Sequence, residues 1–312
     1  MPDRSDVCVL LPTLNEGETI GTVVDGFRHE GFENILVVDG DSTDETREIA
    51  SDRGAKVITQ SGSGKGQAVR EGVSETDQPY VLMADGDGTY RPEDAQQMLE
   101  PLFSGRAEHV IGDRFADMEA GAMTRLNAVG NGLINRTFGV IHGRDLRDIL
   151  SGYRAFTKES FERFRLRSDG FGIETELAVE CVRNGVTTAV VPIRYEKRPD
   201  NSETNLHPVK DGGRIFLTLY RLARMNNPIF YFGSIAGLGV MIGLVIGGFV
   251  GYEYFVRGVS REVMALLSAF FILLSVQLLM FGVLSDIIIS VNREQSRRIE
   301  QLAEQLGDER ND

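Results

Sequence analysis

Two aspartates follow an apolar run in the stretch YVLMADGDGTYRPED, residues 80–94, and one glycine separates Asp85 from Asp87. The helix expected next has its own start signal in Pro92 and the two acidic residues after it, so helix capping does not explain the pair. Two carboxylates at this spacing suit a hard divalent cation, Mg²⁺ or Mn²⁺, which takes oxygen ligands and is often shared with substrate phosphates. The pair alone is a weak signal, and its value depends on what surrounds it.

Two more polar loops follow apolar runs upstream, PTLNE after the run at 7–12 and VVDGDSTDET after a second run. The candidate binding residues in these loops are Pro12, Asn15, Glu16, Asp39 and Asp41. Because Asp39 stands directly at a strand end, it is a better candidate than the acids that follow it for contact with a ribose or a base edge. Capping of the next helix by Ser42, Thr43 or Asp44 explains part of the remaining acidity.

A glycine-rich loop, GSGKGQA at residues 62–68, contains Lys65 but lacks the GxxxxGK[ST] pattern of an ATP-binding phosphate loop. Two interpretations stay open at this point. The loop is either a flexible turn without a function, or an approach to a nucleotide in which Lys65 meets a phosphate.

The elements that must position these loops alternate between short apolar runs and amphipathic helices. The first helix, for example, spaces Ile20, Val23, Val24 and Phe27 at helical intervals. Such alternation predicts an α/β fold, with a mostly parallel sheet covered by helices on both faces. Ligands of these sheets bind beyond the carboxyl ends of the strands, so the three polar loops are expected to converge on one site.

The C-terminal third differs in composition, because residues 225–252 and 263–285 carry no charge. Each run exceeds the roughly 20 apolar residues that cross a bilayer as a helix, whereas a buried pair of helices in a soluble protein is the weaker alternative. We expect two transmembrane helices within 227–291, at about 228–252 and 263–289, joined as an antiparallel hairpin. Small residues in the first run favour close helix packing in lipid.

The positive-inside rule then assigns an orientation. The connection between the helices has two arginines, Arg257 and Arg261, against six in the flanks: Arg214, Arg221, Arg224, Arg293, Arg297 and Arg298. The sequence therefore predicts a multi-pass protein of the cell membrane, with a cytoplasmic catalytic domain at 1–212 and a charged cytoplasmic tail at 292–312. The segment 213–226 is expected to be an interfacial helix, although a mobile lid around 194–212 is equally compatible. The tail is either a solvated end or a weak contact in a homo-oligomer.

Overall composition narrows the function. The formal net charge of −13 and the absence of a basic stripe argue against nucleic-acid binding. Of 33 basic residues five are lysines, which leaves 28 arginines. An acidic, lysine-poor surface suits a halophilic protein, and an ordinary acidic protein is the alternative. The two cysteines, Cys8 and Cys181, lie in apolar patterns and are expected to be buried thiols.

Together, PTLNE, VVDGDSTDET, MADGDGTYRP, VIGDRF and DILSGYRAF resemble, in this order, the family 2 glycosyltransferases with the GT-A fold. Among these the chain is most similar to dolichyl-phosphate (polyprenyl-phosphate) mannosyl- and glucosyltransferases, which would fit a haloarchaeal source. The resemblance covers about 12–225. It implies a nucleotide-diphosphate sugar donor, Mg²⁺ or Mn²⁺, a dolichyl or polyprenyl phosphate acceptor and contact with membrane lipid.

The resemblance also implies roles for individual residues. It assigns the metal to Asp85 and Asp87, and the base and ribose contacts to Pro12, Glu16 and Asp39. Further candidates for contact with the nucleotide sugar are Asn15, Asp41, Lys65 and Arg154. Arg114 and Arg125 would bind the acceptor phosphate. Thr89 stands where close mannosyltransferase relatives carry a glutamine that assists the metal, and the second motif reads DGDS where DDGS is commoner. These departures shift the expected donor slightly toward UDP-glucose, with GDP-mannose or another UDP-hexose as alternatives.

The chemistry expected is an inverting transfer of one hexose, as a step of protein N-glycosylation or of cell-surface glycan synthesis. A phosphate acceptor is already anionic and needs arginine clamps more than a general base. Asp148 is the candidate base for a hydroxyl acceptor; with a phosphate acceptor it would orient Arg154 or the sugar. Two alternatives are a processive polysaccharide synthase, disfavoured by the absence of tryptophan, and a non-catalytic membrane scaffold with the same fold.

Overall fold

A computed structural model describes residues 2–170, 172–198, 213, 220 and 227–308. The chain divides into two compact units, Met1–Leu219 and Tyr220–Asp312, and each is described by itself. Most of the predicted interfacial helix at 213–226 and most of the alternative lid at 194–212 lie outside the described residues, as does 309–312.

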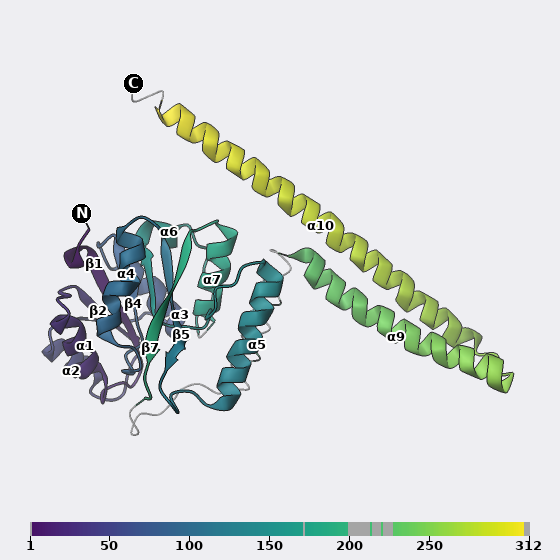
Figure 1. Cartoon of the computed structure of the whole chain (residues 1–312), viewed down its shortest axis with the longest axis horizontal. Helices are drawn as coiled ribbons and strands as arrows, with labels where there is room; N and C mark the ends of the chain where they lie inside the picture. The colour runs from purple at the N-terminus through teal and green to yellow at the C-terminus, as the bar shows by residue number, and fades with distance from the viewer. Residues whose placement is uncertain (1, 171, 199–212, 214–219, 221–226, 309–312) are drawn as a thin grey trace. The chain divides into compact units, whose positions relative to one another are not determined.

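The first unit is built on a seven-stranded sheet of order β3-β2-β1-β4-β6-β5-β7 (Figure 1). The strands are β1 (Val7–Thr13), β2 (Ile35–Asp39), β3 (Lys56–Thr59), β4 (Tyr80–Met83), β5 (His109–Met118), β6 (Arg154–Thr157) and β7 (Thr188–Tyr195). All neighbouring pairs are parallel except those of β6, which runs antiparallel to β4 and β5. The α/β prediction is confirmed, with β6 as the antiparallel member of a mixed sheet.

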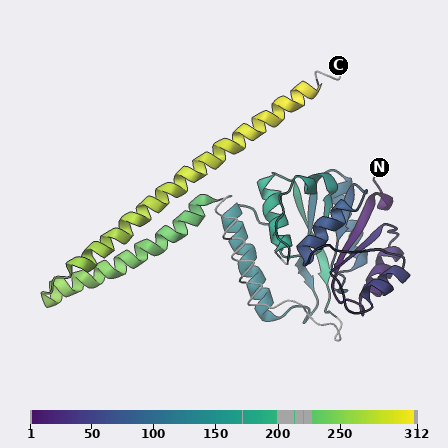
Figure 2. The same cartoon turned by 180° about the vertical axis from the view of Figure 1, so that it is seen from behind.

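Helices cover both faces of the sheet, as Figure 2 shows from behind. They are α1 (Ile20–His29), α2 (Thr46–Asp52), α3 (Lys65–Ser74), α4 (Ala95–Phe103), α5 (Arg125–His142), α6 (Lys158–Glu162) and α7 (Ile173–Arg183), with short 3₁₀ turns η1 (Arg4–Asp6) and η2 (Pro92–Asp94). The continuous apolar run of β1 follows from this layering. Val7, Val9 and Leu11 join one core cluster, and Cys8 and Leu10 join the other, because successive side chains point to opposite faces.

The three neighbouring strands β2, β1 and β4 bring their following loops to one edge. Thr13, at the end of β1, pairs with Asp39 at the end of β2, and the Gly40 N–H donates to the Thr13 carbonyl at 2.8 Å. Gly86, the glycine between the two aspartates, must remain small because a Cβ there would lie 2.6 Å from the Thr13 Cγ2. Close packing of these backbones holds the aspartate loop beside the end of β1.

The second unit is a pair of long helices, α9 (Pro228–Arg257) and α10 (Glu262–Asp308), which run side by side in Figures 1 and 2. A Cβ on Gly243 of α9 would lie 2.8 Å from the Ile272 Cγ1 of α10, and the Ser268 hydroxyl donates to the Gly243 carbonyl at 2.7 Å. Small residues therefore allow the two backbones to approach closely, as in helix pairs within lipid.

Length and composition make both helices candidate membrane spans, over Pro228–Arg257 and Glu262–Val291, and only 11% of the most apolar window of each is buried. That exposure is unlike the largely buried core helices of a soluble protein. At the helix connection Glu253 is buried and pairs with Arg257 and Arg261 at 2.9 and 3.2 Å. Past its candidate span α10 continues as a helix to Asp308.

Candidate active site

A pocket opens where the loops after β1, β2 and β4 meet. The predicted residues that line it are Pro12, Glu16, Lys65, Asp85 and Asp87. Further lining comes from Leu14, Gly40, Gln60, Gly64 and Arg198. The structure thus brings the metal-binding candidates and the first polar loop together, as expected from the strand ends, and places the glycine-rich loop beside them.

Lys65, the first residue of α3, lies between two carboxylates. Its Nζ contacts the Asp85 Oδ1 and lies 2.6 Å from the Glu174 Oε1 at the start of α7. Burial alone would lower the pKa of Lys65, but the two carboxylates raise it above its ordinary value, so the ammonium stays charged. Gly152 packs against this group, because a Cβ there would lie 2.5 Å from the Asp85 Oδ2. The structure therefore gives Lys65 the task of neutralising two acids at the pocket wall.

Asp87 is held from two sides. Its Oδ1 accepts hydrogen bonds from the Thr89 N–H and hydroxyl at 3.1 and 2.7 Å. Its Oδ2 pairs with the Arg198 Nη2 at 2.6 Å, and the same nitrogen lies 3.4 Å from the Glu16 Oε1. Thr89, which departs from the glutamine of mannosyltransferase relatives, thus fixes the orientation of this carboxylate.

Glu16 is an acid of the pocket whose pKa is raised. Burial raises its pKa to about 7, Arg198 opposes the shift, and the neighbouring Asp87 and Asp85 add to it. Near neutral pH a change in the surrounding charge would therefore change whether Glu16 is ionised.

The donor set fits a shared cation. Within the part of the chain that the structure describes, no three His, Cys, Asp or Glu side chains form a metal site by themselves. Asp85 and Asp87 supply carboxylate oxygens to the same pocket, and Mg²⁺ is commonly bound by one or two carboxylates with waters and substrate phosphates completing its shell. These residues fit an ion that a diphosphate helps to hold.

Three predicted binding residues, Asn15, Asp39 and Asp41, do not line the pocket. They belong to the ends of β1 and β2 and the loops that follow. Asp39 is fully buried, and its carboxylate accepts from the Ser42 N–H and hydroxyl at 2.8 and 2.5 Å. Asn15, at a positive φ of 55°, accepts from the Thr43 N–H at 2.9 Å. Asp41 is exposed and pairs with Arg47 at 3.6 Å. In the structure these contacts hold the loops after β1 and β2 in place.

Arg114 and Asp148 form a second charged centre, a buried bidentate pair. The Arg114 Nε and Nη2 donate to the two carboxylate oxygens of Asp148 at 2.7 and 2.8 Å, and the Tyr195 ring lies 5.4 Å from the guanidinium carbon. Burial alone would lower the pKa of Arg114, but Asp148 raises it well above its ordinary value. Asp148 therefore orients Arg114, where the sequence suggested Arg154.

Arg154 lies outside the pocket lining and has no exposed surface. Its guanidinium donates to the carbonyls of Ser151 at 3.0 Å, Ile149 at 2.7 Å and Glu174 at 2.9 Å. These bonds tie β6 to the start of α7. Arg154 thereby supports the segment that carries Glu174, a structural task that its place in the SGYR motif did not reveal.

Arg125 is exposed at the first position of α5 and does not line the pocket. Two further residues contribute to the charge of the pocket, although the sequence gives only a weak indication of them. From the sequence alone, Glu174 in FGIETELAVEC could either contact sugar hydroxyls or begin a helix, and Arg198 stands in none of the motifs. Arg198 follows β7, more than a hundred residues after Asp87, and no spacing rule links the two.

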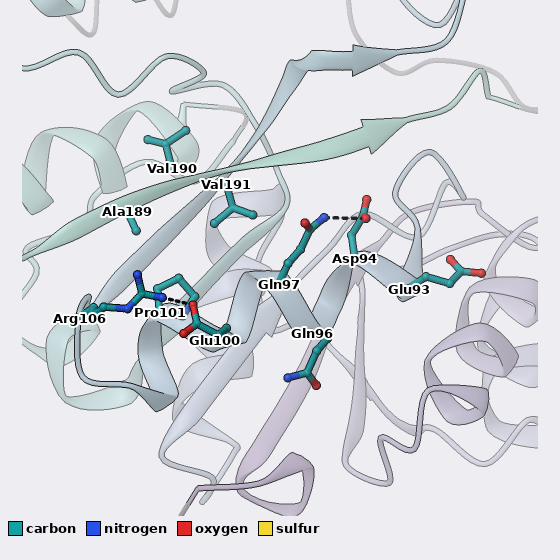
Figure 3. A pocket seen from close by; sticks show the side chains of 10 residues that line it. All are labelled: Glu93, Asp94, Gln96, Gln97, Glu100, Pro101, Arg106, Ala189, Val190 and Val191. Atoms are coloured by element: carbon teal, nitrogen blue, oxygen red, sulfur yellow. Dashed lines mark hydrogen bonds and ion pairs between the residues drawn. The ribbon is translucent and has the colours of Figure 1, made fainter.

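A separate concave surface lies between α4 and the edge strand β7 (Figure 3). Its lining includes Glu93, Gln96, Glu100, Arg106 and Val191, and none of the sequence-predicted site residues. In Figure 3 Arg106 pairs with Glu100 and Gln97 with Asp94. Because the predicted site residues line the strand-end pocket and not this surface, the strand-end pocket is the better candidate site.

The fold and the strand-end pocket define a class, an α/β protein with a carboxylate-rich pocket at the carboxyl ends of its strands. Residues 8–164, just over half of the chain, match the family described as Glycosyl transferase family 2. The chain belongs to this family and is a glycosyltransferase.

Relatives support this membership. The chain is 62% identical over 303 residues to Glycosyltransferase AglJ of Haloferax volcanii, covering 97% of this chain and 100% of that protein. It is 34% identical to a dolichyl-phosphate hexose transferase of the same organism, covering 67% of this chain and 90% of that protein. The source of these relatives agrees with the halophilic interpretation of the composition.

A solved structure shares the fold at low identity. Glucosyl-3-phosphoglycerate synthase from Mycobacterium tuberculosis, in complex with Mn²⁺, UDP-glucose and phosphoglyceric acid, has a TM-score of 0.58 at 22% identity, covering 70% of this chain and 79% of that chain. This likeness confirms the GT-A architecture of the first unit.

Proposed function

We propose that this enzyme transfers one hexose, with inversion, from a nucleotide-diphosphate sugar to dolichyl or polyprenyl phosphate at the cytoplasmic face of the membrane. The observation that carries the proposal is the convergence of Asp85 and Asp87 with Lys65 and Arg198 in one strand-end pocket. Similar proteins are named dolichyl-phosphate transferases, including one for UDP-N-acetylglucosamine in Methanococcus voltae, 26% identical over 60% of this chain and 84% of that protein.

Asp85 and Asp87 would hold Mg²⁺ or Mn²⁺, which supplies charge neutralisation for a departing nucleoside diphosphate. In the structure Lys65 pairs with Asp85, and Arg198 pairs with Asp87. The Lys65 ammonium and the Arg198 guanidinium are therefore close enough to the pocket to contact a diphosphate. Thr89 would keep Asp87 oriented when the metal ion replaces Arg198 as its partner.

Arg114 is the candidate clamp for the acceptor phosphate. Because Asp148 occupies its Nε and Nη2, the fork is fixed and loses little conformational entropy on binding an anion. Both oxygens of Asp148 are engaged in that pair, so we assign this carboxylate an orienting role. An anionic acceptor phosphate needs no general base, and Arg125 would add a second phosphate contact.

The donor is best sought among UDP-sugars, with UDP-glucose slightly favoured and GDP-mannose as the main alternative. The test is a screen of radiolabelled UDP- and GDP-sugars with polyprenyl phosphate and, as a matched control, the corresponding polyprenol. We expect transfer to the phosphate alone. Equal transfer to the alcohol would contradict the phosphate-acceptor mechanism, because that reaction requires a base.

A further inference from the structure

Gln277 is a polar residue in the middle of a candidate membrane span. It lies on α10 midway between Glu262 and Val291, the ends of that span, so roughly 21 Å of helix separates it from either end. Gln277 is exposed on the helix pair, and among the residues that the structure describes its amide has no hydrogen-bond partner. Because hydrocarbon cannot hydrogen-bond an amide, this position is costly in lipid alone.

The neighbouring helix α9 cannot supply the missing partner, because it packs on the other side of α10. The Ser268 hydroxyl of α10 donates to the Gly243 carbonyl of α9 at 2.7 Å, and Ile272 lies against the same glycine. At 100° per residue these two positions of α10 point roughly 140–180° away from Gln277. Gln277 therefore faces away from the contact within the hairpin.

The same side of α10 is apolar beyond the membrane as well. Past its candidate span α10 continues as a helix to Asp308. In this extension Ile299, Leu302 and Leu306 fall within about 40° of the direction of Gln277 on a helical projection. Every charged residue of the extension falls at least about 60° from that direction. An apolar stripe on an otherwise charged helix indicates packing against another helix.

A second copy of α10 fits both features. A bilayer covers apolar residues of the span, such as Phe270 and Leu284 one heptad either side of Gln277, but it cannot pair with the amide. Water, in turn, does not favour the apolar stripe of the extension. An amide is self-complementary, since it has both donors and an acceptor. Copies in one membrane share an orientation, so a two-fold contact along α10 brings Gln277 opposite Gln277.

We propose that the protein forms a parallel dimer through this side of α10. The Gln277 side chains of two copies hydrogen-bond to each other within the membrane, and Ile299, Leu302 and Leu306 pack in a short coiled coil beyond it. Amides that bond across membrane helices strengthen association, and a single polar position in an apolar seam fixes register and the number of helices. The inference rests on the candidate spans and not on the proposed function.

Single cysteines test which side of α10 meets the second copy. The full chain carries Leu284→Cys, on the Gln277 side, or the matched control Val283→Cys, at the same depth but about 100° around the helix. Both positions are exposed, and the native Cys8 and Cys181 are buried. A disulfide requires Cα atoms within about 7 Å. We therefore expect mild oxidation of isolated membranes at molar salt to give a covalent dimer with Leu284→Cys and almost none with Val283→Cys.

The contribution of the amide is measured by Förster transfer between labelled copies of the full chain in lipid vesicles, over a range of protein-to-lipid ratios. Gln277→Leu should weaken dimerisation by roughly tenfold, whereas Gln277→Asn, which keeps an amide, should retain most of the affinity. Leu302→Asp should also weaken dimerisation. Gln301→Asp, which places the same charge on another side of the extension, should not.

Four results would overturn the proposal: equal cross-linking of the two cysteines, no transfer that depends on the protein-to-lipid ratio, wild-type affinity in Gln277→Leu, or equal effects of the two aspartates. Because Gln277 is exposed, its replacement leaves the contact with α9 intact, and thermal unfolding should stay unchanged. Neither cross-linking nor Förster transfer requires sugar transfer, so failure of the dimer is distinguishable from failure of the proposed function.

Discussion

The two charged centres of the catalytic unit differ in how their charges are committed. In the strand-end pocket Lys65 and Arg198 balance acids that line an opening. In the second centre Arg114 and Asp148 are buried and satisfy each other through two hydrogen bonds. A ligand can therefore replace Lys65 and Arg198 as partners of the pocket acids. Asp148, in contrast, keeps Arg114 in one fixed position.

Removing an acid from the exchangeable set should give the largest effect. Asp87→Ala removes the carboxylate that Thr89 orients, and we expect transfer to fall by about 10³-fold, the size typical for loss of a key electrostatic group. Mn²⁺ binding, followed by electron paramagnetic resonance, should weaken in parallel while thermal unfolding stays unchanged. Wild-type Mn²⁺ affinity in Asp87→Ala would remove Asp87 from the metal site.

Breaking the fixed pair should instead cost stability. Asp148→Ala leaves Arg114 buried without its partner, which should lower the free energy of unfolding by about 3 kcal/mol. Urea unfolding of the detergent-solubilised chain measures this. Asp41→Ala, which removes an exposed ion pair with Arg47, is the control and should change stability by less than about 0.5 kcal/mol. Similar losses in the two variants would erase the distinction between the centres.

The pH dependence of the pocket offers a finer test. The folded-state pKa of Glu16 is raised to about 7 from its ordinary 4.5, so the folded protein binds this proton more tightly than the unfolded chain. Its contribution to stability is present below pH 4.5 and is lost as the pH rises toward 7. We expect Glu16→Gln to remove about 3 kcal/mol of this dependence, by linkage, in metal-free buffer. An unchanged pH profile in Glu16→Gln would contradict the shift.

The smallest effect is expected at Arg125, which lies outside both centres. Arg125→Ala should raise the KM for lipid phosphate about tenfold, the value of one charge-assisted hydrogen bond, while donor binding stays unchanged. Arg106→Ala, in the loop between α4 and β5, controls for loss of a surface arginine. Weaker donor binding in Arg125→Ala would refute its assignment to the acceptor.

The sequence predicted the sheet, the strand-end loops and the helix pair because these depend on local periodicity. It also predicted that the polar loops after the first strands converge, but it left open whether Lys65 belongs to the same site. It did not predict which cations pair with which acids. The Arg198–Asp87 and Arg114–Asp148 pairs join segments 111 and 34 residues apart, so they depend on the register of distant elements. For the same reason Arg154 was assigned to the donor, although the structure buries it among backbone carbonyls.

In the proposed function, the strand-end pocket carries out metal-dependent transfer to a lipid phosphate. The most direct test titrates Mg²⁺ and Mn²⁺ into wild-type enzyme and Asp87→Ala with labelled nucleotide sugar and polyprenyl phosphate at molar salt. We expect saturable, metal-dependent formation of glycosylated lipid phosphate by the wild type and almost none by the variant. Transfer that persists in a chelator, or that is equal in both proteins, would contradict it.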